Sequence, residues 1–206
     1  MSLVRRVRPA EGEAAGALVL FHGRGADEYD LEPLGDALDP TRRLDLVLPR
    51  GPLHLPPGGA HWYVVPRVGF PDPPTFAASY EQAGALLDEL YGTYSQVVIG
   101  GFSQGSVMSL ALGLGAGRTS PAGILALSGF VPQVPGFAVD LAGRAVLPVF
   151  LAHGTLDPVI GIMFGRAARD LLDGAVALSY HESPVGHAID PQVLPEMRRW
   201  LDGLIA

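Results

Sequence analysis

The chain has 206 residues, of which 48% are hydrophobic and 17% charged, and it contains no cysteine. This size and composition predict a single domain over residues 1–206, and they exclude disulfides, thiolate catalysis and cysteine-ligated metals. The formal net charge of −7 argues against nucleic acid or an anionic membrane surface as a partner.

No apolar run approaches the ~20 residues that a membrane-spanning helix needs. The first residues also lack the long apolar stretch of a secretory signal. We therefore expect a cytoplasmic protein without a membrane span.

Short apolar runs predict the strands of a sheet. Leu3–Val7 predicts an antiparallel edge strand ahead of a glycine-containing turn. Continuous hydrophobicity in the later runs, rather than alternation, predicts parallel strands that are covered on both faces. These runs are Ala17–His22, Leu44–Pro49, Gln96–Gly101, Gly123–Ser128, Leu147–Ala152 and Val176–His181.

Helical spacing of apolar residues appears between these strands. The expected helices are Phe76–Tyr91, Gln104–Leu114, Ile160–Leu172 and Gln192–Ile205. The alternation predicts an α/β fold, with a mostly parallel central sheet and helices on both faces. The long segment Gly51–Pro74 is rich in proline and glycine, and we expect it to form a lid or a pocket wall.

The sharpest local motif is Gly101-Phe102-Ser103-Gln104-Gly105, a G-x-S-x-G sequence between a predicted strand and a predicted helix. A serine hydroxyl is a poor nucleophile until a tight turn exposes it to a base and a substrate. The small residues on either side let strand and helix approach closely. The motif alone is weak in a chain with 27 glycines, but its setting favours Ser103 as a nucleophile over a plain glycine-rich turn.

An acid and then a histidine should follow the serine, each at the end of a later strand. Asp157 follows the strand Leu147–Ala152, and His187 follows Val176–His181. His187 would take the proton from Ser103, and Asp157 would orient the imidazole. Chain order or position disfavours the other candidates, which are His22, His54, His61, His153, His181, Asp140, Asp170, Asp173 and Asp190.

The sequence His22-Gly23-Arg24-Gly25 follows the second predicted strand and is suited to supply an oxyanion donor. We assign the two donors to the backbone amides of Arg24 and Gln104. The alternative is a glycine-flanked turn that only ends the strand.

Together these segments resemble the phospholipase/carboxylesterase family, including acyl-protein thioesterases, and the first segment is more like its bacterial carboxylesterase branch. The resemblance implies an α/β-hydrolase fold without a separate cap domain, no cofactor or metal, and a possible homodimer. It also implies that Trp62, Phe130 and Val159 line the acyl pocket. The alternative for each of these residues is ordinary packing in the core. The matching stretches are LFHGRGADEYDL (20–31), IGGFSQGS (99–106), LSGFVP (127–132), AHGTLDPVI (152–160) and GHAID (186–190).

The leading hypothesis is therefore a serine carboxylesterase for a small-molecule ester with a short or medium acyl chain. A thioesterase, a lysophospholipase and a hydrolase of dienelactone-like substrates remain open, because pocket shape decides between them. A non-catalytic binding protein of the same fold is the alternative from another class. A metallohydrolase lacks support, since no HExxH motif or close cluster of ligands is present.

Overall fold

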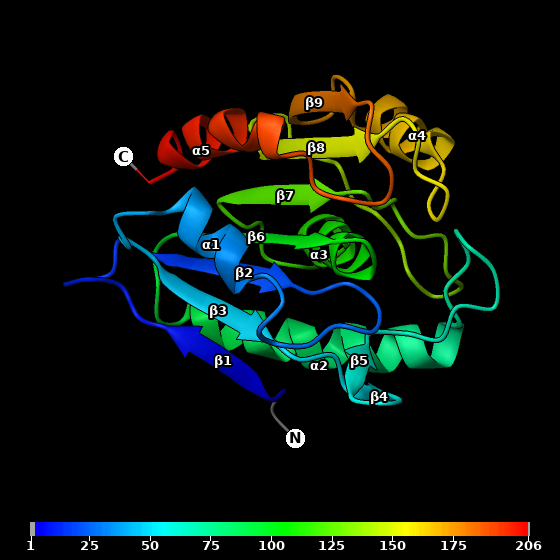
Figure 1. Ribbon diagram of the computed structural model, residues 1–206, viewed down its shortest axis with the longest axis horizontal. Coiled ribbons are helices and arrows are strands. Elements are labelled where there is room, and N and C mark those ends of the chain that lie inside the picture. The colour runs from blue at the N-terminus through cyan, green and yellow to red at the C-terminus, as the bar shows by residue number, and fades with distance from the viewer. Residues whose placement is uncertain (1–2, 206) are drawn as a thin grey trace.

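A computed structural model describes residues 3–205 as a twisted seven-stranded sheet with the strand order β1-β3-β2-β6-β7-β8-β9 (Figure 1). Strand β1 pairs antiparallel with β3, and every other neighbouring pair in this sheet is parallel. The predicted mostly parallel sheet with an antiparallel edge is thus confirmed. Its strands are β1 (Arg5–Arg8), β2 (Ala17–Phe21), β3 (Asp45–Pro49), β6 (Val97–Phe102), β7 (Gly123–Leu127), β8 (Pro148–Gly154) and β9 (Ala177–Ser183).

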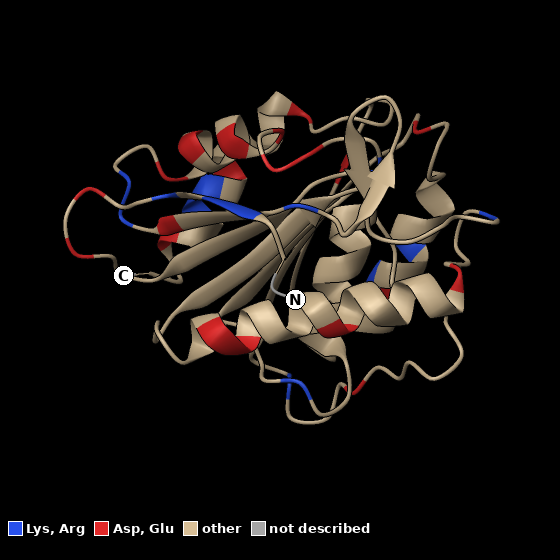
Figure 2. Cartoon of the chain, turned by 90° about the horizontal axis from the view of Figure 1, so that it is seen from below, with Lys and Arg blue, Asp and Glu red and all other residues tan. Residues whose placement is uncertain are grey.

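Helices cover both faces of the sheet, as the sequence predicts. The side chains of a strand alternate between the faces. In β2, Val19 and Phe21 therefore join one apolar cluster, and Leu18 and Leu20 join the other. The first cluster includes residues of α2 (Pro73–Tyr91), α3 (Gln104–Leu114) and α4 (Ile162–Leu172), and the second includes residues of α1 (Glu32–Leu38) and α5 (Leu194–Asp202). Figure 2 shows the central strands of the sheet largely free of charged residues between these layers, whereas the edge strand β1 carries arginines.

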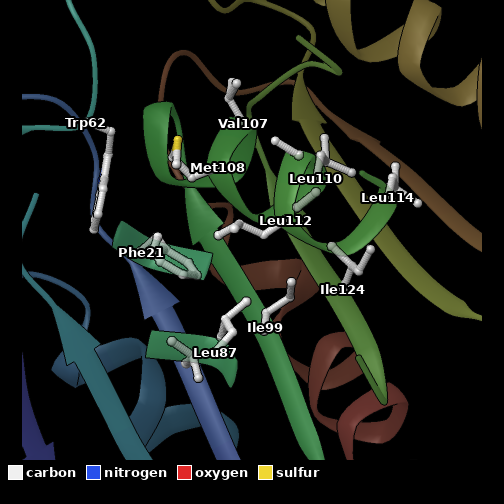
Figure 3. Packing of buried hydrophobic residues seen from close by; sticks show 14 of the residues in the cluster. Phe21, Trp62, Leu87, Ile99, Val107, Met108, Leu110, Leu112, Leu114 and Ile124 are labelled. Carbon is white, nitrogen blue, oxygen red and sulfur yellow. The ribbon is translucent and has the colours of Figure 1, made fainter. Parts of the chain in front are cut away.

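Helix α3 lies at the centre of the larger cluster, where all of its residues are buried. Its apolar side chains, among them Met108 and Leu112, pack near Phe21 and Ile99 of the sheet (Figure 3). Burial of each large apolar side chain contributes about 1.5–3 kcal/mol. The helix that begins directly after Ser103 is therefore one of the most firmly packed elements of the protein.

Several predicted boundaries differ from the observed ones. Edge strand β1 begins at Arg5 rather than Leu3, and the last predicted helix divides into a 3₁₀ turn at Pro191–Val193 and α5. Helix α2 begins at Pro73, because Asp72 caps it by accepting a hydrogen bond from the Thr75 amide. Strand β9 is an edge strand with half-buried residues, so the prediction that Val176–His181 is covered on both faces is wrong.

One helix and two short strands were not predicted. Helix α1 has only seven residues, and it contains Pro33 and Gly35, both poor helix formers. Within the long segment, β4 (Leu53–Leu55) and β5 (Gly59–His61) form a separate antiparallel pair.

None of the helices in the described part of the chain is long and apolar enough to span a membrane.

Candidate active site

Ser103 occupies the turn between β6 and α3, with a φ of 56° and a ψ of −119°. A positive φ is strained for a residue with a side chain, at a cost of about 1–3 kcal/mol, and it persists only where the surroundings impose it. Here the Ser103 amide donates a hydrogen bond to the carbonyl of Leu127, at 2.9 Å. The strained turn that the G-x-S-x-G motif predicts is present.

The glycines of the motif allow the turn to close. A Cβ atom at Gly101 would collide with the backbone of Gly105, and a Cβ atom at Gly105 would collide with the carbonyl of Phe21. Strand β6, helix α3 and the end of β2 therefore meet backbone to backbone. No larger residue fits at either position without a shift of the main chain.

Three side chains from separate strand ends form one chain of hydrogen bonds. The Nε2 atom of His187 lies 2.9 Å from the Ser103 hydroxyl, and its Nδ1 atom lies 2.6 Å from a carboxylate oxygen of Asp157. Ser103 follows β6, Asp157 follows β8 and His187 follows β9. These residues meet because the carboxyl ends of parallel strands lie along one edge of the sheet. Ser103 and Asp157 are buried, at 8% and 7% exposure.

Asp157 is held as a carboxylate. Burial alone would raise its pKa, but hydrogen bonds from His187 and from the amides of Ile160 and Val159 outweigh burial and lower the pKa. The two amides donate to the second carboxylate oxygen at 2.9 and 2.8 Å. The aspartate therefore presents a fixed negative charge to the imidazole.

The backbone amides of Gln104 and Arg24 are the oxyanion donors that the sequence predicts, and this role stays a prediction. Gln104 is the first residue of α3, so its N–H has no acceptor within the helix. Arg24 follows Gly23, where an added Cβ atom would lie 3.3 Å from the Phe102 ring and 3.5 Å from the Ser103 side chain. No backbone carbonyl in the described residues accepts a hydrogen bond from the Arg24 amide.

His22 has a structural position beside this site. Its Nε2 atom accepts a hydrogen bond from the Gly51 amide at 2.9 Å, so its Nδ1 atom carries the proton that faces the carbonyl of Gly23 at 2.7 Å. Burial lowers the pKa of His22, which keeps the ring neutral. The residue links the loop after β2 to the start of the long segment.

The remaining histidines also lie apart from the Ser103 hydroxyl. His153 is buried beneath the Asp157 loop, where its Nε2 atom lies 2.7 Å from the carbonyl of Ile160. His181 stacks on Phe150 and pairs with Glu196. His61 contacts the carbonyl of Tyr63, and His54 is exposed on β4. In the part of the chain that the structure describes, no cluster of three potential metal ligands is found.

A cavity of about 380 Å³ opens beside Ser103. Part of its wall is the stretch of the long segment between β5 and α2, residues 62–72, which we call the pocket segment. Phe130 and Val159 line the cavity, as the resemblance implies. The full lining is Arg24, Tyr63, Val65, Arg67, Val68, Gly69, Pro71, Ser103, Gln104, Phe130, Val159 and Ile160.

The structure does not bring Trp62 to this cavity. Its side chain is fully buried, 5.2 Å from Phe21 between ring centroids, and its indole N–H donates to the carbonyl of His22. A buried indole needs an acceptor for its N–H, and the strand-end carbonyl supplies one. Trp62 therefore packs behind the cavity wall as a core residue.

Sequence reasoning missed the side chain of Gln104. Its carboxamide accepts a hydrogen bond from the Trp62 amide at 2.9 Å and donates one to the Tyr63 carbonyl at 2.7 Å. It thus ties the start of the pocket segment to the residue after Ser103. Arg67 and a second cavity of about 530 Å³ were also missed, and neither has a signature in the local sequence.

Comparison with known proteins identifies this architecture. A model of the phospholipase/carboxylesterase family matches residues 4–205. The chain belongs to this family. The predicted family and fold are therefore confirmed, and the chain is an enzyme, an esterase or thioesterase of the α/β-hydrolase fold.

Several known proteins resemble the chain over nearly its full length. Acyl-protein thioesterase 1 of Debaryomyces hansenii is 26% identical over 97% of this chain and 96% of its own length. The structure of esterase PE8 is 25% identical, with a TM-score of 0.81, over 99% of this chain and 100% of that one. A carboxylesterase of Bacillus cereus has the same fold, with a TM-score of 0.84 at 21% identity over 98% of this chain and 94% of that one.

Proposed function

We propose that Ser103, His187 and Asp157 form a catalytic triad that hydrolyses carboxylic esters of short to medium acyl chains. The observation that carries this proposal is the continuous hydrogen bonding from the Asp157 carboxylate through His187 to the Ser103 hydroxyl. Such an arrangement activates an otherwise weak nucleophile.

The reaction proceeds in two steps. The Ser103 oxygen attacks the ester carbonyl while His187 takes the hydroxyl proton, and the backbone amides of Arg24 and Gln104 bind the oxyanion. His187 then gives this proton to the departing alkoxide, which leaves an acyl group on Ser103. Water then attacks the acyl carbonyl while His187 takes one of its protons. The bond between the acyl carbon and the Ser103 oxygen breaks, and His187 returns the proton to that oxygen, which releases the acid and restores the serine hydroxyl.

The acyl preference rests on the shape of the cavity. Phe130 and Val159 form part of the wall of a space of about 380 Å³, and Phe130 also lines the neighbouring cavity. The Phe130 ring, 5.4 Å from that of Phe164, stands between the two spaces and limits the length of a straight acyl chain. A thioester is the second candidate, because a relative of the chain is named an acyl-protein thioesterase.

The test is a panel of 4-nitrophenyl esters from acetate to palmitate, with a thioester of matched acyl group. We expect kcat/KM to be highest for butanoate to octanoate and to be much lower for palmitate. A maximum at palmitate would overturn the proposed chain length. A thioester that is turned over far faster than its matched ester would favour the second candidate.

Covalent labelling separates an enzyme of this mechanism from a binding protein of the same fold. A fluorophosphonate probe should label the wild-type chain and leave the Ser103→Ala variant unlabelled, because the probe needs an activated serine. Equal labelling of both proteins would contradict the assignment of Ser103.

A further inference from the structure

The arginines of this chain divide into two groups. All fourteen basic residues are arginine. Within the described residues, every guanidinium except those of Arg24 and Arg67 contacts a carboxylate or donates to a backbone carbonyl. Arg144 and Arg198 donate to carbonyls. The arginines paired with carboxylates are Arg5, Arg6, Arg8, Arg42, Arg43, Arg50, Arg118, Arg166, Arg169 and Arg199.

Arg24 and Arg67 both line the cavity that contains Ser103. Among the described residues, no aspartate or glutamate belongs to that lining, and the other walls are mostly apolar. The cavity is thus a positively charged site in a chain with a formal net charge of −7. A cleft lined by charges of one sign concentrates ligands of the opposite sign.

Arg67 is held in place by the turn that contains it. The Phe70 amide donates to the Arg67 carbonyl at 3.0 Å, and Gly69 between them has a φ of +86°. The turn rests on Phe164, because a Cβ atom at Gly69 would lie 2.6 Å from that ring. The Arg67 guanidinium lies 3.7 Å from the centroid of the Phe70 ring. A stacked guanidinium loses less conformational freedom when it binds an anion.

Arg24 lies on a second, separately fixed loop. The Gly25 amide donates to the carbonyl of Ala60, and the Ala60 amide donates to the carbonyl of Ala26, each at 2.8 Å. These bonds join the loop to β5. Because the Arg24 amide is the proposed oxyanion donor, its side chain starts next to the reacting carbonyl.

We propose that the substrate is an ester or thioester that carries an anionic group, such as a carboxylate, which Arg24 and Arg67 bind. This inference rests on the proposed function, since it concerns the same cavity. The two guanidiniums supply charge-assisted hydrogen bonds that the apolar walls cannot. The anionic group lies in either the acyl half or the leaving half of the substrate, and matched substrates distinguish the two.

The experiment compares pairs of esters that differ only in charge. For the acyl half, the mono-4-nitrophenyl ester of adipic acid, which keeps a free carboxylate, is compared with the 4-nitrophenyl ester of adipic acid monoamide, which is neutral. For the leaving half, 4-carboxyphenyl butanoate is compared with 4-carbamoylphenyl butanoate. In at least one pair we expect kcat/KM to be about tenfold or more higher for the anion, in line with hydrogen bonds to charged groups.

Variants test which side chain causes the preference. Arg67→Gln should lower the ratio of anionic to neutral kcat/KM about tenfold, while Arg67→Lys retains part of it because the charge remains. Arg199→Gln removes the same charge from the exposed surface of α5 and should leave the ratio unchanged. Added salt should lower the wild-type ratio, since it screens exposed charges.

The outcomes separate this inference from the proposed function. A wild-type ratio of one or below in both pairs, or an Arg67→Gln variant with an unchanged ratio, overturns the anion site and leaves the serine mechanism intact. Unchanged hydrolysis of the neutral esters by Ser103→Ala would instead overturn the proposed function.

Discussion

The strand ends that carry Ser103, Asp157 and His187 differ sharply from the pocket segment that faces them. Ser103 and Asp157 are buried, and the helix after Ser103 has no exposed residue. The pocket segment begins with the buried Trp62 and Tyr63, but beyond them Val64 and Phe70 are each 44% exposed. The residues of the proposed triad thus lie where any movement would disrupt a packed core. The exposed part of the pocket segment, which would select the substrate, is a loop that tolerates changes of sequence.

The largest effect should come from Ser103 itself. We expect Ser103→Ala to lower kcat for 4-nitrophenyl butanoate by about 10³-fold or more, because the nucleophile is lost. Ser106→Ala is the matched control: it lies on the same helix, and its buried hydroxyl has no hydrogen-bond partner in the described residues. Steady-state kinetics of both variants test the contrast. Near-normal turnover by the Ser103→Ala variant would contradict the assignment of Ser103 as the nucleophile.

The pH profile should show a single ionisation on its acid side. A histidine base accepts the serine proton only in its neutral form, so kcat/KM should fall about tenfold per pH unit at acid pH. The lowered pKa of Asp157 keeps its carboxylate ionised in mildly acid solution, so Asp157 adds no second step there. Initial rates in buffers of constant ionic strength provide the measurement. An acid limb with a slope of two, or a flat profile, would contradict these roles.

Two glycine substitutions compare the tight turn at Ser103 with the exposed turn between β4 and β5. Gly105→Ala places a methyl group against the Phe21 carbonyl, so we expect a loss of about 1–3 kcal/mol in the free energy of unfolding, or more. Gly58→Ala, in the turn between β4 and β5, meets no atom within 4 Å and should change stability by less than ~0.5 kcal/mol. Urea denaturation of both variants gives the comparison. Equal stabilities would show that the tight turn is not rigid.

The smallest effect concerns acyl length. Phe130→Leu shortens the side chain between the two cavities, so octanoate should gain about threefold to tenfold in kcat/KM relative to butanoate. The same ester series as for the wild type measures this shift. Phe137→Leu serves as a control, because Phe137 lines neither cavity. If both variants had the same profile as the wild type, Phe130 would not be the barrier to longer chains.

The sequence predicted the strand ends that carry Ser103, Asp157 and His187 far better than it predicted the pocket segment, and the reason is physical. A turn like that at Ser103 depends on neighbours within two residues, so its glycines are visible in the chain. Asp157 and His187 could be found because parallel strands deliver their carboxyl ends to one edge.

The pocket side depends on contacts between distant segments. The fixed position of Arg67 requires Phe164, nearly a hundred residues away, and the burial of Trp62 requires the carbonyl of His22. Helix α1 was missed because its local sequence disfavours a helix, and packing against α5 and β3 overrides that preference. Such features become visible only when the chain is folded.

The two hydrogen bonds of the Gln104 side chain set a limit on how the cleft can widen. They fasten the backbone at Trp62 and Tyr63 to the first residue of α3. Val64 is anchored as well, because its carbonyl accepts from the Asp72 amide and its amide donates to the Thr75 hydroxyl. We therefore expect a bulky ligand to displace only residues 65–71 of the pocket segment. We expect the cavity to widen on that side alone, so that the Gln104 amide, which is the proposed oxyanion donor, stays in place beside Ser103.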